Sequence, residues 1–170
     1  LLLFALLGWA LAQSEGNPGG FGVNSKFREL TVEHRTAPEF MGKDLDGDVV
    51  SLSGLRGKVV MLDFWSSWCP PRRKEAPVLA QVYREYESRN VEFVGLAIWD
   101  RQGNVDNYVQ EFDMSYPNLI DDRGQIGIDY GVSGIPEKFF IDADGNLVRK
   151  FIGPMDEEEL RAVLEELLAP

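Results

Sequence analysis

The sequence predicts an α/β fold in which a central β-sheet of mixed direction is flanked by helices. Two apolar runs of strand length, residues 58–65 and 91–98, are each followed by a segment with helical spacing, which is the pattern of parallel strands joined by helices. Later in the chain, Asp144-Gly145 separates two further strand-like runs, and this dipeptide favours a tight turn between antiparallel strands. Parallel and antiparallel strands should therefore share one sheet that is covered on both faces.

Length and composition indicate one folded domain with a tail. The chain has 170 residues, of which 44% are hydrophobic and 26% charged, and this composition is ordinary for a globular protein. The formal net charge of -11 would repel a polyanion, and the basic side chains are scattered apart from Arg72-Arg73-Lys74. We therefore exclude nucleic acid as the main partner.

Residues 1–12 form an unbroken apolar run, and a polar stretch follows from Gln13. The run is shorter than the about 20 residues that a membrane-spanning helix needs. Because the sequence lacks an initiating Met, we interpret the run as a truncated signal peptide or membrane anchor. Ala10-Leu11-Ala12 fits the small-x-small pattern before a signal-peptidase site, and the alternatives are an uncleaved anchor or a buried core helix. Signal and anchor both predict an extracytoplasmic domain, in the periplasm or on the outer face of the cytoplasmic membrane.

A tether and a hairpin should come next. Residues 13–36 are rich in Gly, carry mixed charges and show no helical or strand periodicity, so they predict a flexible tether. The folded domain is predicted at residues 37–170. It should open with a β-hairpin at residues 40–52, in which Asp46-Gly47 supplies the turn.

The first half of the domain predicts the order strand, helix, strand, helix. Residues 58–65 are an apolar run, as in a strand that is buried on both faces. Apolar positions recur at helical spacing over residues 75–88, where Pro77 should kink the helix near its start. Residues 91–98 predict the next strand, and residues 104–112 carry apolar side chains on one helical face.

The second half predicts a hairpin and a final helix. A short segment at residues 125–130 precedes strands at residues 138–141 and 147–152. A helix should begin at Asp156, because the three glutamates that follow suit the positive N-terminal end of the helix dipole. Its buried stripe is formed by Leu160, Val163, Leu164, Leu167 and Leu168. This order of elements is that of the thioredoxin fold, extended here by the N-terminal β-hairpin.

The single cysteine, Cys69, lies between a buried strand and the first turn of a helix. Free N–H groups at a helix N-terminus, together with the helix dipole, stabilise a thiolate, which is the species that attacks disulfides. The basic residues at positions 72–74 should act in the same direction. We therefore expect Cys69 to be a nucleophile with a pKa below the reference value near 8.5, the alternative being a small buried hydrophobic residue.

Residues around Cys69 carry a resemblance to a known family. Residues 37–170 resemble the TlpA, ResA and CcmG (DsbE) group of exported thiol-disulfide oxidoreductases within the redoxin or AhpC-TSA superfamily. The match rests on Trp68, Cys69, Pro70, Pro71, Arg73, Glu75 and Pro77. The resemblance implies that Trp68, Pro70 and Pro71 contact substrate. Trp65 and Trp68 could both line a groove, although aromatic residues at a strand end are often core.

A second match lies in residues 130–137, which are similar to the family loop whose cis-proline faces the active cysteine. By this resemblance Pro136 is that proline, and Ile135 presents the carbonyl and amide that pair with a substrate peptide. The alternative is an ordinary turn proline, because cis bonds occur in only about 5% of X-Pro peptides.

Two carboxyl groups complete the predicted site. Asp63 lies six residues before the thiol and matches the buried acid of thioredoxin, whereas Glu75 matches the acid of the cytochrome-maturation reductases. A carboxyl group in apolar surroundings has a raised pKa and can move protons near neutral pH. We assign catalytic roles to Cys69, Glu75 and Asp63; the alternative for Glu75 is a solvated charge on the helix surface.

Arg72 departs from the family pattern, because it occupies the position of the second, resolving cysteine. In the dithiol mechanism the second thiol breaks the mixed disulfide and releases the reduced product. Without it, attack by Cys69 is still possible, but release requires an outside thiol.

These features predict an extracytoplasmic disulfide reductase that resembles the enzymes of cytochrome c maturation. Its expected partners are cysteine-containing exported proteins such as apocytochrome c and a membrane thiol-electron donor. The alternatives are a thioredoxin-fold binding module without turnover and a one-cysteine peroxidase. With one Cys and with His34 as the only histidine, we expect no metal site and no cofactor.

Overall fold

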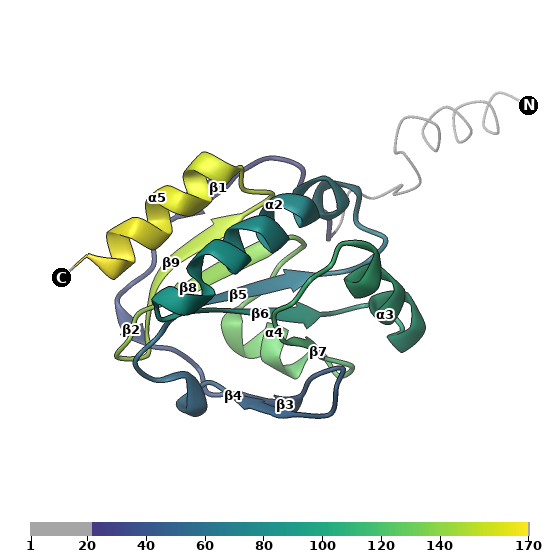
Figure 1. Cartoon of the computed structure of the whole chain (residues 1–170), viewed down its shortest axis with the longest axis horizontal. Coiled ribbons are helices and arrows are strands. Elements are labelled where there is room, and N and C mark those ends of the chain that lie inside the picture. Colours follow the sequence, from purple (N-terminus) through teal and green to yellow (C-terminus); the bar gives the residue numbers. More distant parts are fainter. Residues whose placement is uncertain (1–21, 170) are drawn as a thin grey trace, which may run out of the picture.

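The computed structural model describes residues 22–169, and the predicted leader at residues 1–12 lies outside them. A seven-stranded central sheet has the order β1-β9-β8-β5-β6-β7, with β2 also paired to β9 (Figure 1). Its strands are β1 (Arg28–Leu30), β2 (Arg35–Thr36), β5 (Val59–Trp65), β6 (Val91–Ala97), β7 (Asn118–Ile120), β8 (Glu137–Ile141) and β9 (Asn146–Ile152).

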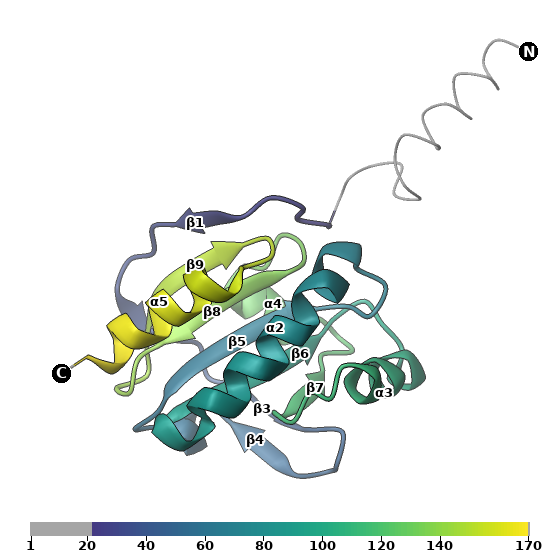
Figure 2. The ribbon, with the colours of Figure 1, turned by 45° about the horizontal axis from the view of Figure 1, so that its top comes forward.

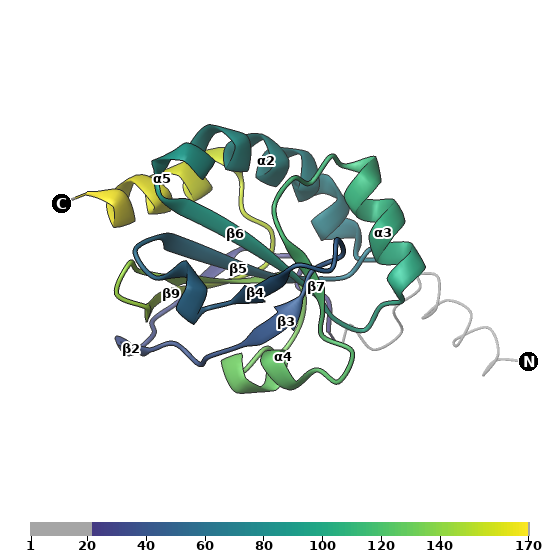
Figure 3. The same ribbon diagram turned by 60° about the horizontal axis from the view of Figure 1, so that its bottom comes forward.

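The helices form layers on the two faces of the sheet (Figure 3). One face is covered by α2 (Pro70–Tyr86), α3 (Gln102–Glu111) and α5 (Glu157–Leu168), and α2 and α5 lie side by side across it (Figure 2). The other face carries α4 (Gln125–Tyr130) and the hairpin of β3 (Met41–Lys43) and β4 (Val49–Ser51). Two short 3₁₀ helices, η1 (Ser53–Leu55) and η2 (Glu87–Arg89), join these elements.

Strand directions confirm the predicted mixed sheet. β5, β6 and β7 are parallel, whereas β8 is antiparallel to both β5 and β9. Every residue of β5, β6 and β8 is buried, because a hydrophobic cluster lies on each face of the sheet. This arrangement explains why those strands appear in the sequence as nearly continuous apolar runs.

The predicted turns and the last helix are also confirmed. Gly47 and Gly145 have φ angles of 92° and 80°, which glycine adopts without steric cost. Asp156 is the N-cap of α5: its side chain accepts a hydrogen bond from the Glu159 N–H, and the Glu159 side chain accepts one from the Asp156 N–H. This capping box stabilises the helix start by satisfying donors that have no intrahelical partner.

Three boundaries differ from the sequence prediction. β1 and β2 pair with β9, so the described part of the predicted tether lies along the sheet and that prediction is corrected there. No strand was predicted at residues 118–120, which form the short edge strand β7, and α2 begins at Pro70 rather than residue 75. The helix accepts prolines at its first two positions because N–H groups there have no intrahelical acceptor. Across residues 22–169, no helix combines the length and apolar composition that crossing a bilayer requires.

Candidate active site

Cys69 lies where β5 passes into α2, as predicted, and is the N-cap residue of that helix. A short loop precedes it, fixed by the Cys69 N–H, which donates to the Ser66 carbonyl at 3.2 Å. The Ser67 N–H donates to the Asp100 carboxylate at 2.6 Å. The loop therefore holds the cysteine at the C-terminal end of the parallel strands, the edge at which open α/β sheets bind ligands.

The thiol of Cys69 faces the loop before β8. Its side chain is 0% exposed, and Sγ donates to the Ile135 carbonyl at 3.8 Å. The Ile135-Pro136 peptide bond is cis. The structure thus brings together Cys69, Ile135 and Pro136, which the sequence placed in one site although they are far apart along the chain.

Burial raises the pKa of the Cys69 thiol above its ordinary value. The Arg72 backbone N–H and the Arg72 charge act against this rise, but their effect is smaller, and the nearby Asp63 and Glu75 charges raise the pKa further. The expectation of a lowered pKa was therefore wrong. Pro70 and Pro71 explain part of the difference, because the first two helical positions supply no N–H group to the sulfur.

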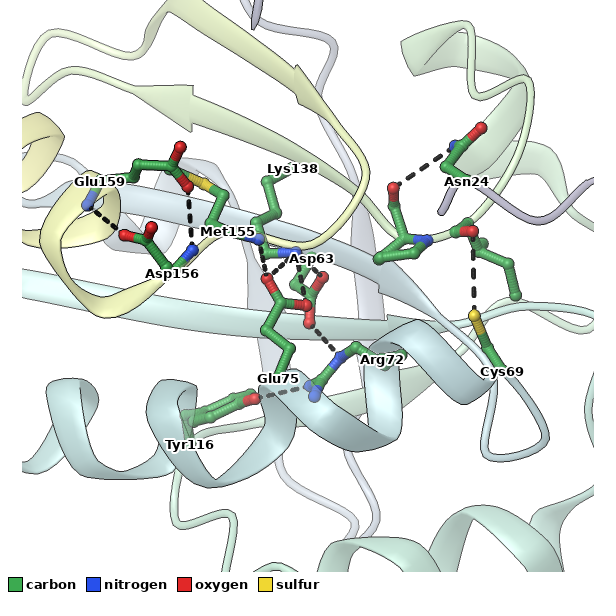
Figure 4. A network of polar contacts seen from close by, with 12 residues as sticks. Asn24, Asp63, Cys69, Arg72, Glu75, Tyr116, Lys138, Met155, Asp156 and Glu159 are labelled. Carbon is green, nitrogen blue, oxygen red and sulfur yellow. Dashed lines mark hydrogen bonds and ion pairs between the residues drawn. The ribbon is translucent and has the colours of Figure 1, made fainter. Parts of the chain in front are cut away.

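The Arg72 side chain points into the core, away from Cys69, and reaches a buried carboxylate (Figure 4). Its Nε lies 2.9 Å from Asp63 Oδ2, and its terminal nitrogens donate to the hydroxyl groups of Tyr108 at 3.3 Å and Tyr116 at 3.0 Å. The guanidinium carbon lies 5.4 Å from the centroid of the Trp65 ring. Arg72 is therefore held by an ion pair, two hydrogen bonds and an aromatic face.

A second buried cation, Lys138, joins the same cluster. Its Nζ lies 2.7 Å from Glu75 Oε1 and 3.4 Å from Asp63 Oδ1, and Glu75 Oε1 also accepts the Met155 N–H at 2.6 Å. Burial raises the pKa of Glu75, and the Lys138 charge partly offsets the rise. Asp63, Arg72, Glu75 and Lys138 form a buried four-charge cluster with equal numbers of each sign.

Glu75 is therefore in the core, not on the solvated helix surface that was its alternative location. Both carboxylates are engaged in ion pairs, Asp63 with Arg72 and Glu75 with Lys138. A proton gained or lost by either carboxyl group would change the charge balance of the four-charge cluster. Their roles as proton donors stay a prediction.

An exposed aromatic rim borders the cysteine. Trp68 is 46% and Trp99 55% exposed, and the Trp68 Nε1–H donates to the Trp99 carbonyl at 3.1 Å. Pro70 is exposed and Pro71 half-buried, so these residues are placed where a partner can touch them. Trp65 is fully buried, which confirms the alternative that it belongs to the core.

The side chain of Glu137 holds the loop that carries Ile135 by accepting hydrogen bonds from its backbone. One oxygen of this buried carboxylate accepts the Ser133 N–H at 3.1 Å and the Gly134 N–H at 3.0 Å, while the other lies 2.9 Å from Lys150 Nζ. From the N-terminal side, the Asn24 N–H donates to the Ile135 carbonyl at 2.5 Å. The backbone opposite Cys69 is therefore fixed by contacts from two directions.

Sequence reasoning missed Lys138, Tyr108, Tyr116 and Asn24. A signal existed for Lys138, because it is a lysine within an apolar strand, and an unpaired charge there is costly. Lys138 is the direct cross-strand partner of Asp63. For the two tyrosines, nothing in the local sequence pattern distinguishes a hydroxyl group that accepts a hydrogen bond from a distant arginine.

Comparisons with known proteins agree with this geometry. A model of the AhpC/TSA family matches residues 34–150. The thiol-disulfide oxidoreductase ResA of Bacillus cereus (strain ZK / E33L) is 34% identical over 167 residues, covering 98% of this chain and 91% of that protein. ResA of Bacillus subtilis (strain 168) is 34% identical over 130 residues, covering 76% of this chain and 73% of that protein.

Solved structures show the same similarity. A thioredoxin-family thiol:disulfide interchange protein from Chlorobium tepidum TLS aligns with a TM-score of 0.74 at 33% identity, covering 82% of this chain and 100% of that one. A secreted Mycobacterium tuberculosis disulfide oxidoreductase homologous to E. coli DsbE aligns with a TM-score of 0.68 at 32% identity, covering 75% of this chain and 96% of that one.

Proposed function

Since the chain belongs to the AhpC/TSA family and is a thioredoxin-fold thiol-disulfide oxidoreductase of the ResA type, we propose that it works with Cys69 alone, outside the cytoplasm. The observation that carries this proposal is the pair of opposed side chains at the start of α2. Sγ of Cys69 faces the Ile135 carbonyl, whereas Arg72, which the family resemblance assigns to the resolving position, is enclosed in the buried four-charge cluster.

The chemistry balances in three steps. The Cys69 thiolate attacks one sulfur of a partner disulfide, forming a mixed disulfide and releasing the other partner sulfur as a thiolate. An external thiolate, such as glutathione, attacks the Cys69 sulfur and frees the second partner thiolate. A second external thiolate then regenerates Cys69 and leaves as the oxidised external disulfide, so two external thiols are oxidised for each partner disulfide reduced.

Arg72 acts as a structural substitute for the missing cysteine in this proposal. Arg72 is paired with Asp63 in the core, and its side chain offers the mixed disulfide no nucleophile. Partner release is therefore slow without an external thiol. The complex formed after the first step should persist long enough to be isolated.

The proposed partners are exported proteins that contain cysteines, apocytochrome c among them, with a membrane thiol-electron donor as the reductant. Support comes from the apolar run at residues 1–12 and from the similarity to ResA over nearly the whole chain. The exposed Trp68 and Trp99 offer an apolar contact for a polypeptide near the thiol.

The testing experiment compares disulfide reduction by the full chain and by Arg72→Cys, each with and without glutathione. We expect the unmodified chain to turn over with glutathione, and we expect Arg72→Cys, reduced beforehand, to reduce one equivalent of disulfide without any added thiol. Circular dichroism of both proteins checks that Arg72→Cys has folded. A failure of glutathione to support turnover by the unmodified chain contradicts the proposal, as does a lack of any reaction at Cys69.

A binding module without turnover is the second candidate, favoured by the buried Cys69 thiol and its raised pKa. In that case partners bind the unmodified chain as tightly as a Cys69→Ser variant, because no covalent step contributes. A one-cysteine peroxidase is distinguished by rapid consumption of hydrogen peroxide, which the proposed function does not predict.

A further inference from the structure

The first described residues of the chain pair with Ile135 as a short parallel strand. The Ile135 N–H donates to the Gly22 carbonyl at 2.7 Å, and the Asn24 N–H donates to the Ile135 carbonyl at 2.5 Å. Val23 is the direct bridge partner of Ile135. Both backbone polar groups of Ile135 are therefore engaged by residues 22–24.

Side-chain contacts on both sides hold residues 22–24, here called the internal strand, in position. A Cβ atom on Gly22 would lie 3.2 Å from the Trp99 ring, and Gly22 has a φ of 84°, so only glycine fits there without strain. The Asn24 amide reaches the Pro136 carbonyl at 3.4 Å and Glu137 Oε1 at 3.5 Å. Val23 packs against the hydrophobic cluster that contains Cys69. Residues 22–24 are thus seated by backbone, side-chain and steric contacts together.

The internal strand and the thiol meet at one acceptor atom. The Ile135 carbonyl accepts the Asn24 N–H on one side and faces Sγ of Cys69 at 3.8 Å on the other. Figure 4 shows the hydrogen bonds of the Asn24 side chain and of Cys69 Sγ to neighbouring carbonyl groups, those of Pro136 and Ile135 respectively. A thiolate cannot donate to a carbonyl, so this arrangement favours the protonated, unreactive form of the sulfur. With the strand in place, the Cys69 side chain is 0% exposed.

We propose that residues 22–24 are a built-in occupant of the peptide-pairing edge at Ile135, and that a partner polypeptide reaches Cys69 by replacing them strand for strand. The proposal rests on the proposed function, because it concerns access to the same thiol. The partner it fits is an extended segment that offers a carbonyl and an N–H two residues apart, with a small residue beneath Trp99.

In competition of this kind, the apparent affinity for partners is the intrinsic affinity multiplied by the fraction of time that the internal strand is unbound. Weakening the internal strand should therefore expose the thiol without changing its chemistry. Removal of one backbone hydrogen bond should increase the open fraction by about fivefold.

The experiment measures the rate at which iodoacetamide alkylates Cys69 in the full chain, at one fixed pH. Asn24→Pro removes the N–H that donates to Ile135, together with the two long side-chain contacts of Asn24, so alkylation should be at least about fivefold faster. Gly22→Ala should also accelerate it, because the added methyl group meets Trp99 at an unfavourable φ. Ser25→Pro is the matched control: it stiffens the same segment, and the Ser25 N–H forms no hydrogen bond within residues 22–169.

Hydrogen exchange of two backbone amides provides the second readout. The Ile135 N–H should exchange faster in Asn24→Pro, while the Phe139 N–H, in the centre of the sheet, should be unchanged and so report an intact fold. Equal alkylation rates in all the proteins, with Phe139 still protected, overturn the proposal. That result would leave the proposed function standing, because reduction with glutathione is measured separately.

Discussion

Replacing Arg72 by Met removes one of the two cations in the buried four-charge cluster while keeping most of the side-chain volume. Asp63 and Glu75 are then left with Lys138 alone, and the Tyr116 hydroxyl loses the guanidinium that donates to it. Breaking a buried ion pair by removing one partner costs about 3 to 5 kcal/mol. For a domain of this size the melting temperature should fall by ~6 to 20 °C.

The loss should also depend on pH. Burial already raises the pKa of Glu75, and Arg72 is one of the charges that lower it, so the substitution raises that pKa further. A carboxyl group whose folded-state pKa lies above its unfolded value binds its proton more tightly in the native state, so the variant loses stability as the pH rises. The cost of Arg72→Met should therefore be larger at pH 8 than at pH 5.

The assay is urea unfolding followed by tryptophan fluorescence, since Trp65 lies against the guanidinium. Arg73→Met is the matched control, because Arg73 pairs with Glu111 at the surface and such pairs contribute about 0 to 1 kcal/mol. Adding Asp63→Asn to Arg72→Met should recover part of the loss, through a coupling of about 1 to 3 kcal/mol. If Arg72→Met costs no more than Arg73→Met, the cluster is not the structural element described above.

Three further predictions concern the thiol, the sheet and the loop before β8. The pH midpoint of Cys69 alkylation should lie above the ordinary cysteine value of about 8.5, because burial raises its pKa; a midpoint at or below that ordinary value refutes this. Gly95→Ala should cost about 1 to 3 kcal/mol in urea unfolding, because the new methyl group meets Asn118 Oδ1. Gly103→Ala, where a Cβ meets nothing within 4 Å, should be neutral or stabilising, and equal losses at both glycines contradict the prediction. Glu137→Ala should cost about 2 kcal/mol, because it leaves the buried Gly134 N–H and the partly buried Ser133 N–H without their acceptor; melting-temperature shifts below ~2 °C argue against that role.

The sequence predicted the sheet where hydrophobic periodicity was strong. The runs at residues 58–65 and 91–98 are buried on both faces, and burial of that kind leaves a continuous apolar pattern. The edge strands β1 and β2 carry polar side chains with high exposure, so their pairing with β9 leaves no such pattern. Weakly patterned edge strands of two or three residues are therefore recognised only from the backbone hydrogen bonds they complete.

Prediction of the site succeeded for the residues around Cys69 and failed for its electrostatics. The position of Cys69 at a helix start and its meeting with Ile135 were both expected. The rise in the pKa of Cys69 was not expected. Arg72 pairs with Asp63, and burial of the Cys69 thiol raises its pKa. A run of basic residues in a sequence does not indicate which guanidinium group points outward and which is buried beside a carboxylate.

The most direct test of the central claim is the mass of the full chain after reaction with a disulfide-containing peptide, in the absence of other thiols. The account predicts a single adduct at Cys69 that persists until glutathione is added and then disappears as reduced peptide is released. An adduct that resolves without added thiol, or a chain whose Cys69 forms no adduct under conditions in which Arg72→Cys reduces the same peptide, would contradict the account.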